Sequence, residues 1–256
     1  MIQTAHPAGR APRAALASWE RLKATLLDLL YPPRCAGCNA RGAWFCAQCV
    51  SQLARVAAPT CSLCGEPILA RKPPQPGPTL CPRCQTRPLA LDGLRFVAYF
   101  EGPLRRAVHQ LKYRGCRAVA PALGHLMAAT FLADSFPCEL LIPVPLHAQR
   151  LRERGYNQAD LLARAVGAEL AVPVRPAALA RCRATRSQVE LNAQERRDNV
   201  RAAFTVPPAA AGAIQGQATV LIDDVCTTGA TLEACAAALR QAGARSVWGL
   251  TLGRER

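Results

Sequence analysis

Four pairs of cysteines, each pair separated by two residues, carry the clearest chemistry in the chain. The eight residues are Cys35, Cys38, Cys46, Cys49, Cys61, Cys64, Cys81 and Cys84. Two cysteines at this spacing lie on one tight turn, so two such turns supply four thiolates to a tetrahedral zinc ion. A closed site of this kind has no open coordination position and therefore stabilises structure. The pattern predicts one or two structural zinc ions.

The spacing leaves the pairing of these turns open. Neighbouring pairs share a metal in one arrangement, and the first pair joins the third in a cross-braced one. One real site beside a degenerate second is a further alternative, and disulfides or a redox centre compete with zinc. Residues 1–23 show neither the apolar stretch nor the cleavage site of a signal peptide. We therefore expect a reducing, cytoplasmic setting in which the cysteines bind metal.

A second motif follows an apolar segment near the C-terminus. Residues 218–223 (ATVLID) predict a buried strand that ends on two carboxylates, Asp223 and Asp224. Small and hydroxyl residues then lead into a predicted helix: Val225, Cys226, Thr227, Thr228, Gly229, Ala230 and Thr231. Small residues let backbone amides approach a phosphate, and a helix N-terminus adds positive charge. We predict a phosphate at 225–231, with sugar hydroxyls or a metal beside the carboxylates; an ordinary Asp-rich turn is the alternative.

A third segment follows another apolar strand, residues 140–144. Two prolines, Pro143 and Pro145, stiffen the turn that includes Val144 and Leu146. Four basic or titratable side chains follow: His147, Arg150, Arg152 and Arg154. Cations placed directly after a strand end suit an anionic ligand, whereas the alternative is a solvated helix face.

An alternation of strands and helices must position these segments. Strands are predicted at 94–100, 140–144, 172–174, 202–206, 218–223 and 246–252, and helices at 103–113, 118–133, 157–170 and from the second motif to 242, where Gly243 is the expected cap. Apolar strands alternating with helices predict an α/β fold, with a parallel sheet covered on both faces.

The rest of the chain divides by composition. We predict a disordered tail at 1–13, an amphipathic helix at 14–33, a cysteine-rich module at 34–90 and the α/β domain at 91–256. The amphipathic helix is expected to pack on the body of the protein, with membrane-surface binding as the alternative. No uncharged apolar run reaches the ~18 residues of a membrane span.

The charge points to an anionic partner. Lysine and arginine number 32 against 17 acidic residues, a formal charge of +15. Nucleic acid or a phosphorylated metabolite fits this balance. Only 5% of residues are aromatic, which argues mildly against a platform on which bases stack. The 50% of hydrophobic residues excludes a wholly disordered chain.

Taken together, these segments resemble the ComF family, in which a double zinc ribbon precedes a type I phosphoribosyltransferase domain. The resemblance covers about residues 31–253 and rests on the cysteine pairs, residues 101–106 (EGPLRR), 143–146 (PVPL), 152–159 (RERGYNQA) and 223–231 (DDVCTTGAT). It implies that the chain binds 5-phosphoribosyl 1-pyrophosphate (PRPP) with Mg²⁺. Residues 225–231 would then hold the 5-phosphate, and Pro143–Leu146 with Arg150 and Arg154 the pyrophosphate.

The resemblance also implies a loop, residues 181–204, that closes over PRPP. Thr185 and Gln188 match the family pattern there, and Arg183 is a candidate from its charge. These three residues complete the catalytic set with Asp223 and Asp224. A surface linker is the alternative.

The family is associated with DNA uptake and transformation, which implies single-stranded DNA or another nucleic acid and proteins of the competence machinery as partners. Two functions follow. The first is phosphoribosyl transfer to an acceptor that the sequence does not identify. The second is a non-catalytic, nucleic-acid-binding accessory role, in which the transferase fold serves as ligand sensor or scaffold.

Overall fold

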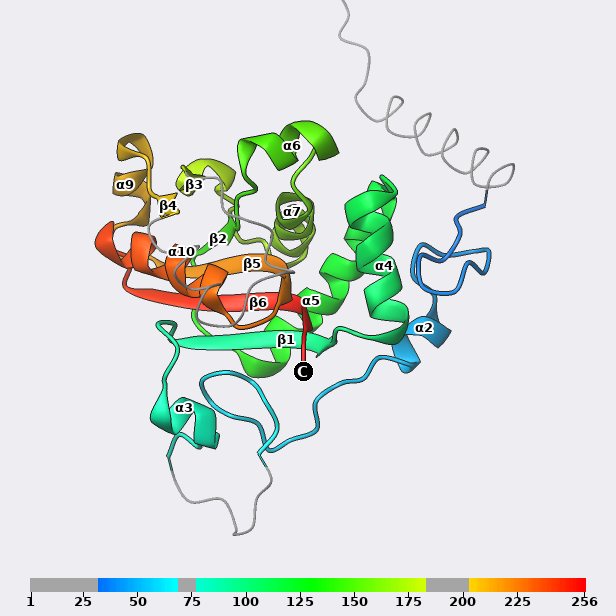
Figure 1. Ribbon diagram of the computed structural model, residues 1–256, viewed down its shortest axis with the longest axis horizontal. Helices are drawn as coiled ribbons and strands as arrows, with labels where there is room; N and C mark the ends of the chain where they lie inside the picture. The colour runs from blue at the N-terminus through cyan, green and yellow to red at the C-terminus, as the bar shows by residue number, and fades with distance from the viewer. Residues whose placement is uncertain (1–31, 69–76, 183–202) are drawn as a thin grey trace, which may run out of the picture.

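The computed structural model describes residues 32–68, 77–182 and 203–256 (Figure 1). Its centre is a sheet of four parallel strands in the order β1 (Gly93–Tyr99), β6 (Ser246–Arg254), β5 (Ala218–Cys226) and β2 (Leu140–Pro143). Parallel strands need crossover connections, and helices supply them here. The predicted α/β fold class is confirmed.

Helices cover both faces of the sheet. On one face α4 (Gly102–Tyr113), α5 (Ala120–Asp134) and α7 (Gln158–Leu170) pack over side chains such as Leu141 and Val220. On the other face α10 (Ala230–Gln241) packs over the intervening Ile142 and Leu221. Because successive strand residues point to opposite faces, continuous apolar runs serve two cores.

Several boundaries differ from the prediction. Strand β5 runs to Cys226 because Val225 pairs with Gly253 and Cys226 with Arg254. Val225 and Cys226 are therefore strand residues, whereas the sequence had predicted them in the loop. The loop itself shortens to Thr227–Gly229, which we call the β5–α10 loop.

The small elements were predicted least well. The helices α6 (Ala148–Arg154) and α9 (Pro208–Ile214) were not expected. The strand expected at 172–174 is a single bridge from Val174 to Leu141. The weak strand near 204 is β4 (Phe204–Thr205), which pairs antiparallel with β3 (Ala180–Arg181). Short 3-10 turns at Arg117–Val119 and Pro176–Ala178 complete the connections.

The cysteine-rich region forms two knuckles. The first knuckle (residues 34–53) contains α2 (Ala47–Ser51) and lies beside α4, whereas the second knuckle (residues 60–68 and 77–87) contains α3 (Pro82–Thr86) and lies below β1 in the view of Figure 1. The predicted tail and all but the last two residues of the predicted amphipathic helix lie outside the described residues. Within the described ranges no helix is both long and apolar enough to cross a membrane.

Candidate functional site

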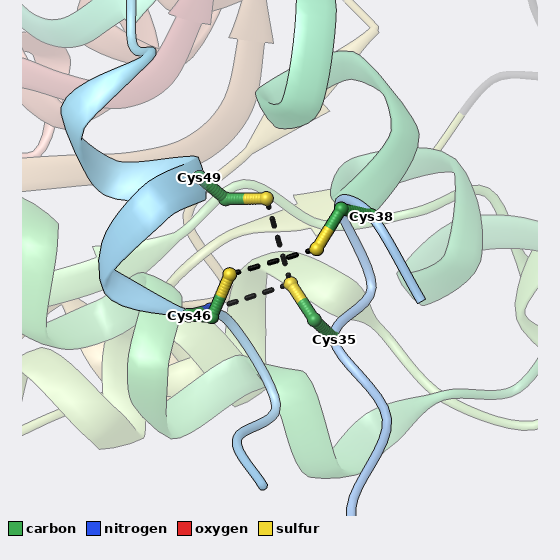
Figure 2. A group of neighbouring side chains, drawn as sticks. All are labelled: Cys35, Cys38, Cys46 and Cys49. Atoms are coloured by element: carbon green, nitrogen blue, oxygen red, sulfur yellow. Dashed lines mark hydrogen bonds between the residues drawn. The ribbon is translucent and has the colours of Figure 1, made fainter. Parts of the chain in front are cut away.

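Each knuckle gathers four sulfur atoms. Cys35, Cys38, Cys46 and Cys49 form one cluster (Figure 2), and Cys61, Cys64, Cys81 and Cys84 form the other, with the sulfurs of a cluster all within 4.8 Å of one another. Neighbouring pairs in the sequence therefore share a site, and the cross-braced alternative is wrong.

The sulfur spacing fits zinc. The Sγ atoms of Cys35 and Cys49 are 3.6 Å apart, those of Cys38 and Cys46 also 3.6 Å, and those of Cys64 and Cys81 3.7 Å. A tetrahedron with Zn–S bonds of ~2.3 Å has edges of about 3.8 Å. All eight cysteines are free of disulfides, so both clusters suit a closed, structural site.

Backbone amides prepare one thiolate in each cluster. The amides of Gly37 and Cys46 donate to Cys35 Sγ at 3.4 and 3.3 Å. Burial opposes ionisation of Cys35, but these amides outweigh it and lower the pKa of the thiol to about 6. Cys61 receives the amides of Cys64 and Cys81 in the same way, and its pKa falls to about 7. Thiolates are the metal-binding form of cysteine.

The β5–α10 loop lies at the carboxyl edge of the sheet. Gly229 adopts a φ of +89°, which side-chain-bearing residues rarely adopt, and turns the chain into α10. The amide of Ala230 donates to Thr228 Oγ1 at 3.3 Å. The loop and the N-terminus of α10 thus face a cavity of about 140 Å³. Open parallel sheets bind ligands at this edge.

Most of the predicted ligand residues line this cavity. From the predicted set it contains Val144, Pro145, Leu146, Arg150, Asp223, Asp224, Val225, Cys226, Thr227, Gly229, Ala230 and Thr231. Pro143 lies in β2 and is buried, and the Thr228 hydroxyl accepts the amide of Ala230; neither residue lines the cavity. Arg183, Thr185 and Gln188 lie outside the described residues.

The two carboxylates have different partners. Asp224 is 3% exposed, and its Oδ2 lies 2.7 Å from Lys112 Nζ. Burial acts to lower the pKa of Lys112, but the Asp224 carboxylate outweighs it and raises that pKa. Asp223 accepts the amide of Asp224 at 2.8 Å. Burial and the adjacent Asp224 charge raise the pKa of Asp223 to about 8, so this carboxyl holds a proton near neutral pH.

Two arginines that line the same cavity suit an anionic ligand. Arg150 on α6 and Arg181 on β3 both line the cavity. Burial, and then the charge of Arg150, lower the pKa of Arg181. An anionic ligand would relieve the repulsion between these two guanidinium groups.

Asn157 ties the proline-rich turn to the body of the domain. Its Nδ2 donates to Val144 O at 3.0 Å, and its Oδ1 accepts the amide of Ala159 at 3.0 Å as the cap of α7. The amide of Val144 donates to Ile222 O at 2.9 Å. The turn at 144–146 is therefore held beside β5.

A second, larger cavity of about 980 Å³ adjoins the first. The two share Lys112, Arg150, Val225 and Thr227. Arg154, predicted for pyrophosphate, lines this second cavity and not the first. It donates to Gln158 Oε1, and its guanidinium lies 5.5 Å from the ring centre of Tyr113.

Four residues that line the first cavity were not among the predicted site residues: Lys112, Gln158, Arg181 and Leu232. Residues 112–115 (KYRG) read as a basic turn that could contact the ligand or a nucleic acid, but the sequence does not show that Lys112 meets the buried Asp224 carboxylate. Gln158 is 4% exposed and Arg181 comes from a two-residue strand. Gln158 belongs to the 152–159 motif and Arg181 to the predicted loop at 181–204, but the sequence assigned neither side chain to the site.

Known proteins resemble this chain both in its cysteine-rich region and over most of its length. The Double zinc ribbon domain family matches residues 26–87. The DNA utilization protein YhgH of Escherichia coli O157:H7 is 33% identical over 86% of this chain and 96% of its own. Competence protein F of Haemophilus influenzae is 29% identical over 80% of this chain and 89% of its own.

Among solved structures, a glutamine PRPP amidotransferase from B. subtilis, complexed with ADP and GMP, matches with a TM-score of 0.37 and 19% identity. The match covers 53% of this chain and 26% of the amidotransferase chain.

Proposed function

Because the chain belongs to the ComF family, together with the DNA utilization protein YhgH and competence protein F, we propose that it binds PRPP and transfers the phosphoribosyl group. The observation that carries this proposal is the cavity in which two carboxylates, an amide-lined loop and two arginines meet at one sheet edge. These groups match the hydroxyl, phosphate and pyrophosphate parts of one ligand.

Each part of the ligand has a partner in this scheme. The 5-phosphate lies on the β5–α10 loop and the N-terminus of α10, where backbone amides and the Thr227 and Thr231 hydroxyls donate. Pyrophosphate lies against the 144–146 turn and Arg150, and we assign Arg181 to the same group because it lines the same cavity. The ribose hydroxyls face Asp223.

Transfer breaks the bond between ribose C1 and pyrophosphate and forms one from C1 to an acceptor atom, which loses its proton. Positive charge develops on the sugar, so positioning and electrostatics carry the rate gain. The departing pyrophosphate is a base that can take up this proton, while the Asp223 carboxyl, whose pKa is raised to about 8, can donate a hydrogen bond to a ribose hydroxyl. The larger cavity is contiguous with the first and is the place for an acceptor.

Magnesium fits this site as a companion of the ligand. The Asp224 carboxylate is already paired with Lys112, so a metal would rely on oxygens of PRPP itself, with Asp223 nearby. Its chemistry there would be to neutralise the departing pyrophosphate.

Calorimetric titration of the purified protein with PRPP and Mg²⁺ tests the proposal. We expect saturable binding, which weakens at least about tenfold in Asp223→Asn or Asp224→Asn, because each replaces a group that faces the cavity. Asp160→Asn is the control, since Asp160 pairs with Arg164 on the surface of α7. Absence of heat with the wild-type protein, or equal affinity in all variants, would reject PRPP binding.

A second candidate is the nucleic-acid-binding accessory role, which the larger cavity favours. Arg105, Arg150 and Arg154 line it, and Tyr113, 64% exposed, offers a ring on which a base can stack. The names of the relatives refer to DNA utilization and competence. Proteins of the competence machinery are the further partners proposed here.

Fluorescence anisotropy with a labelled single-stranded oligonucleotide tests this role. Binding should weaken steeply with salt, and Tyr113→Ala should weaken it about tenfold through lost stacking. Leu132→Ala on α5 is the control, because Leu132 is exposed to a similar degree, 60%, and does not line the cavity. A separate assay of PRPP turnover distinguishes the two functions. Turnover in the absence of DNA supports the transferase function, whereas PRPP binding without turnover supports the role of ligand sensor.

A further inference from the structure

The second knuckle touches the β5–α10 loop directly. Arg83 lies on α3 between Cys81 and Cys84, and its Nη2 donates to Thr228 O at 3.0 Å. Because C=O and N–H point in opposite directions across a trans peptide, this contact turns the N–H of Gly229 away from α3. Gly229 lines the smaller cavity. Arg83 thus sets the orientation of a peptide group at the predicted phosphate site.

Apolar and backbone contacts extend the same interface. Leu89 packs both against the cysteine cluster of the second knuckle and against the core beneath α10. A methyl group placed on Gly229 would lie 3.5 Å from Leu89 Cδ2, an ordinary packing distance. The amide of Ala90 donates to Glu233 Oε1, in the first turn of α10, at 3.3 Å.

A buried arginine connects the knuckle to the strand that enters the loop. Arg254 is 1% exposed, and its Nε donates to Glu66 Oε1 of the second knuckle at 2.6 Å. Its Nη1 donates to Cys226 Sγ at 3.4 Å. Tyr99 also donates to Glu66, at 2.9 Å. If the knuckle moved away, the Arg254 charge would be buried without a counter-ion beside the loop, which is unfavourable.

The first knuckle has no such relation to the loop among the described contacts. In the first knuckle, Gln48 occupies the position that corresponds to Arg83, directly before Cys49 in the second pair. The first knuckle contacts α4 instead, where Arg106 donates to Gly37 O. The two knuckles, each built on two C-x-x-C pairs, therefore have different neighbours.

We propose that the second knuckle holds the β5–α10 loop in its ligand-binding conformation, with Arg83 as the positioning residue. The four cysteines Cys61, Cys64, Cys81 and Cys84 fold the knuckle by holding zinc, so the state of this cluster controls the loop, whereas that of the first cluster does not. The identity of the ligand rests on the proposed function; the coupling between knuckle and loop does not.

Hydrogen exchange of the ligand-free protein tests the coupling by itself. Arg83→Ala should speed exchange of the amides at 227–231 about threefold or more, because a charged donor to the loop is lost. Arg87→Ala is the matched control: it removes the same charge directly after α3, and Arg87 makes no side-chain hydrogen bond or ion pair in the described part of the chain. Gln48→Ala is the control in the first knuckle. Arg83→Lys keeps a donor and should restore part of the protection.

A cysteine variant tests the knuckle as a whole. Cys84→Ser should leave about one zinc ion per chain by mass spectrometry and speed exchange at 227–231. If loop exchange is unchanged both in Arg83→Ala and in a folded Cys84→Ser chain that has lost one zinc ion, the proposal is overturned.

Calorimetry with PRPP and Mg²⁺ separates the two proposals. Arg83→Ala should raise the Kd about three- to tenfold, the effect of one charge-assisted hydrogen bond, while Arg87→Ala leaves it unchanged. A wild-type protein that does not bind PRPP would reject the proposed function and leave the exchange result standing. Faster loop exchange in Arg83→Ala with an unaltered Kd would overturn the claim that this conformation is the one that binds ligand.

Discussion

The Lys112 ammonium and the Asp224 carboxylate lie 2.7 Å apart, with side-chain exposures of 21% and 4%. The carboxylate would be costly to bury alone, and the lysine side chain at the end of α4 compensates it. The pair thus connects α4, which lines the larger cavity, to the strand that ends at the smaller one.

We expect Lys112→Met to destabilise the protein by about 3 kcal/mol, because it leaves Asp224 buried without a counter-charge. The double variant Lys112→Met with Asp224→Asn should cost clearly less than the sum of the single changes, by chemical denaturation. Arg164→Met, which breaks an exposed pair with Asp160, should cost at most about 0.5 kcal/mol. Additive single effects at 112 and 224 would show that the two side chains are not coupled.

Asp223 makes stability depend on pH in a defined direction. Its pKa rises from an ordinary 3.8 to about 8 in the folded protein, chiefly through burial and then through the Asp224 charge. Between these values the folded state keeps a proton that the unfolded state releases. Raising the pH through this window therefore favours unfolding.

The corresponding prediction compares wild type with Asp223→Asn by denaturant unfolding between pH 5 and 8. Wild type should lose more stability across this range than the variant, which has no carboxyl to ionise. Zinc binding also depends on pH, but in the same way in both proteins. The difference in stability between them therefore reports on Asp223 alone. Parallel stability curves would mean that Asp223 is ionised throughout.

At the scale of elements, the β5–α10 loop depends on one glycine. Gly229 precedes α10 with φ +89° and lines the cavity. A side chain would find room there, since Leu89 Cδ2 would lie 3.5 Å away, so its cost is conformational. The strand, the turn and the helix form one unit only with this residue in the left-handed region.

Gly229→Ala should therefore destabilise the protein by about 1–2 kcal/mol. Gly212→Ala should have the opposite sign, a gain of roughly 0.5–1 kcal/mol, because Gly212 lies in the exposed interior of α9 with open space around it. Thermal or denaturant unfolding of both variants checks the pair. A stabilising Gly229→Ala would contradict the left-handed conformation.

At the scale of the whole molecule, the two knuckles are attached differently. Cys35 and Cys49 belong to the large core that also contains Val97 and Leu104. The cysteines of the second knuckle form a separate cluster. Zinc binding supplies folding free energy in either case, but only the first cluster is continuous with the main core.

We expect two zinc ions per chain by mass spectrometry under native conditions. Cys49→Ser should lower the midpoint of thermal unfolding more than Cys84→Ser, because it disrupts the main core as well as a metal site. Circular dichroism of both variants, with zinc content measured in parallel, makes the comparison. Equal lowering by the two variants would show that both knuckles contribute alike to the stability of the domain.

Local sequence patterns determined much of this protein. The spacing of eight cysteines predicted the metal ligands, and the apolar segments at 140–144 and 218–223 predicted two strands of the sheet. The acidic and hydroxyl residues at 223–231 predicted the ligand loop. These features depend on residues close together in the chain, so periodicity and turn chemistry are sufficient to find them.

Only the tertiary structure decided which cysteine pairs share a site, that Lys112 meets Asp224, and that Arg83 reaches Thr228. It also moved Val225 and Cys226 from the loop into β5, because their pairing partners lie in β6. Each of these contacts joins residues brought together by packing of the sheet, the helices and the knuckles. The residues that meet in these contacts are far apart in the sequence, so local sequence patterns do not predict that they come together.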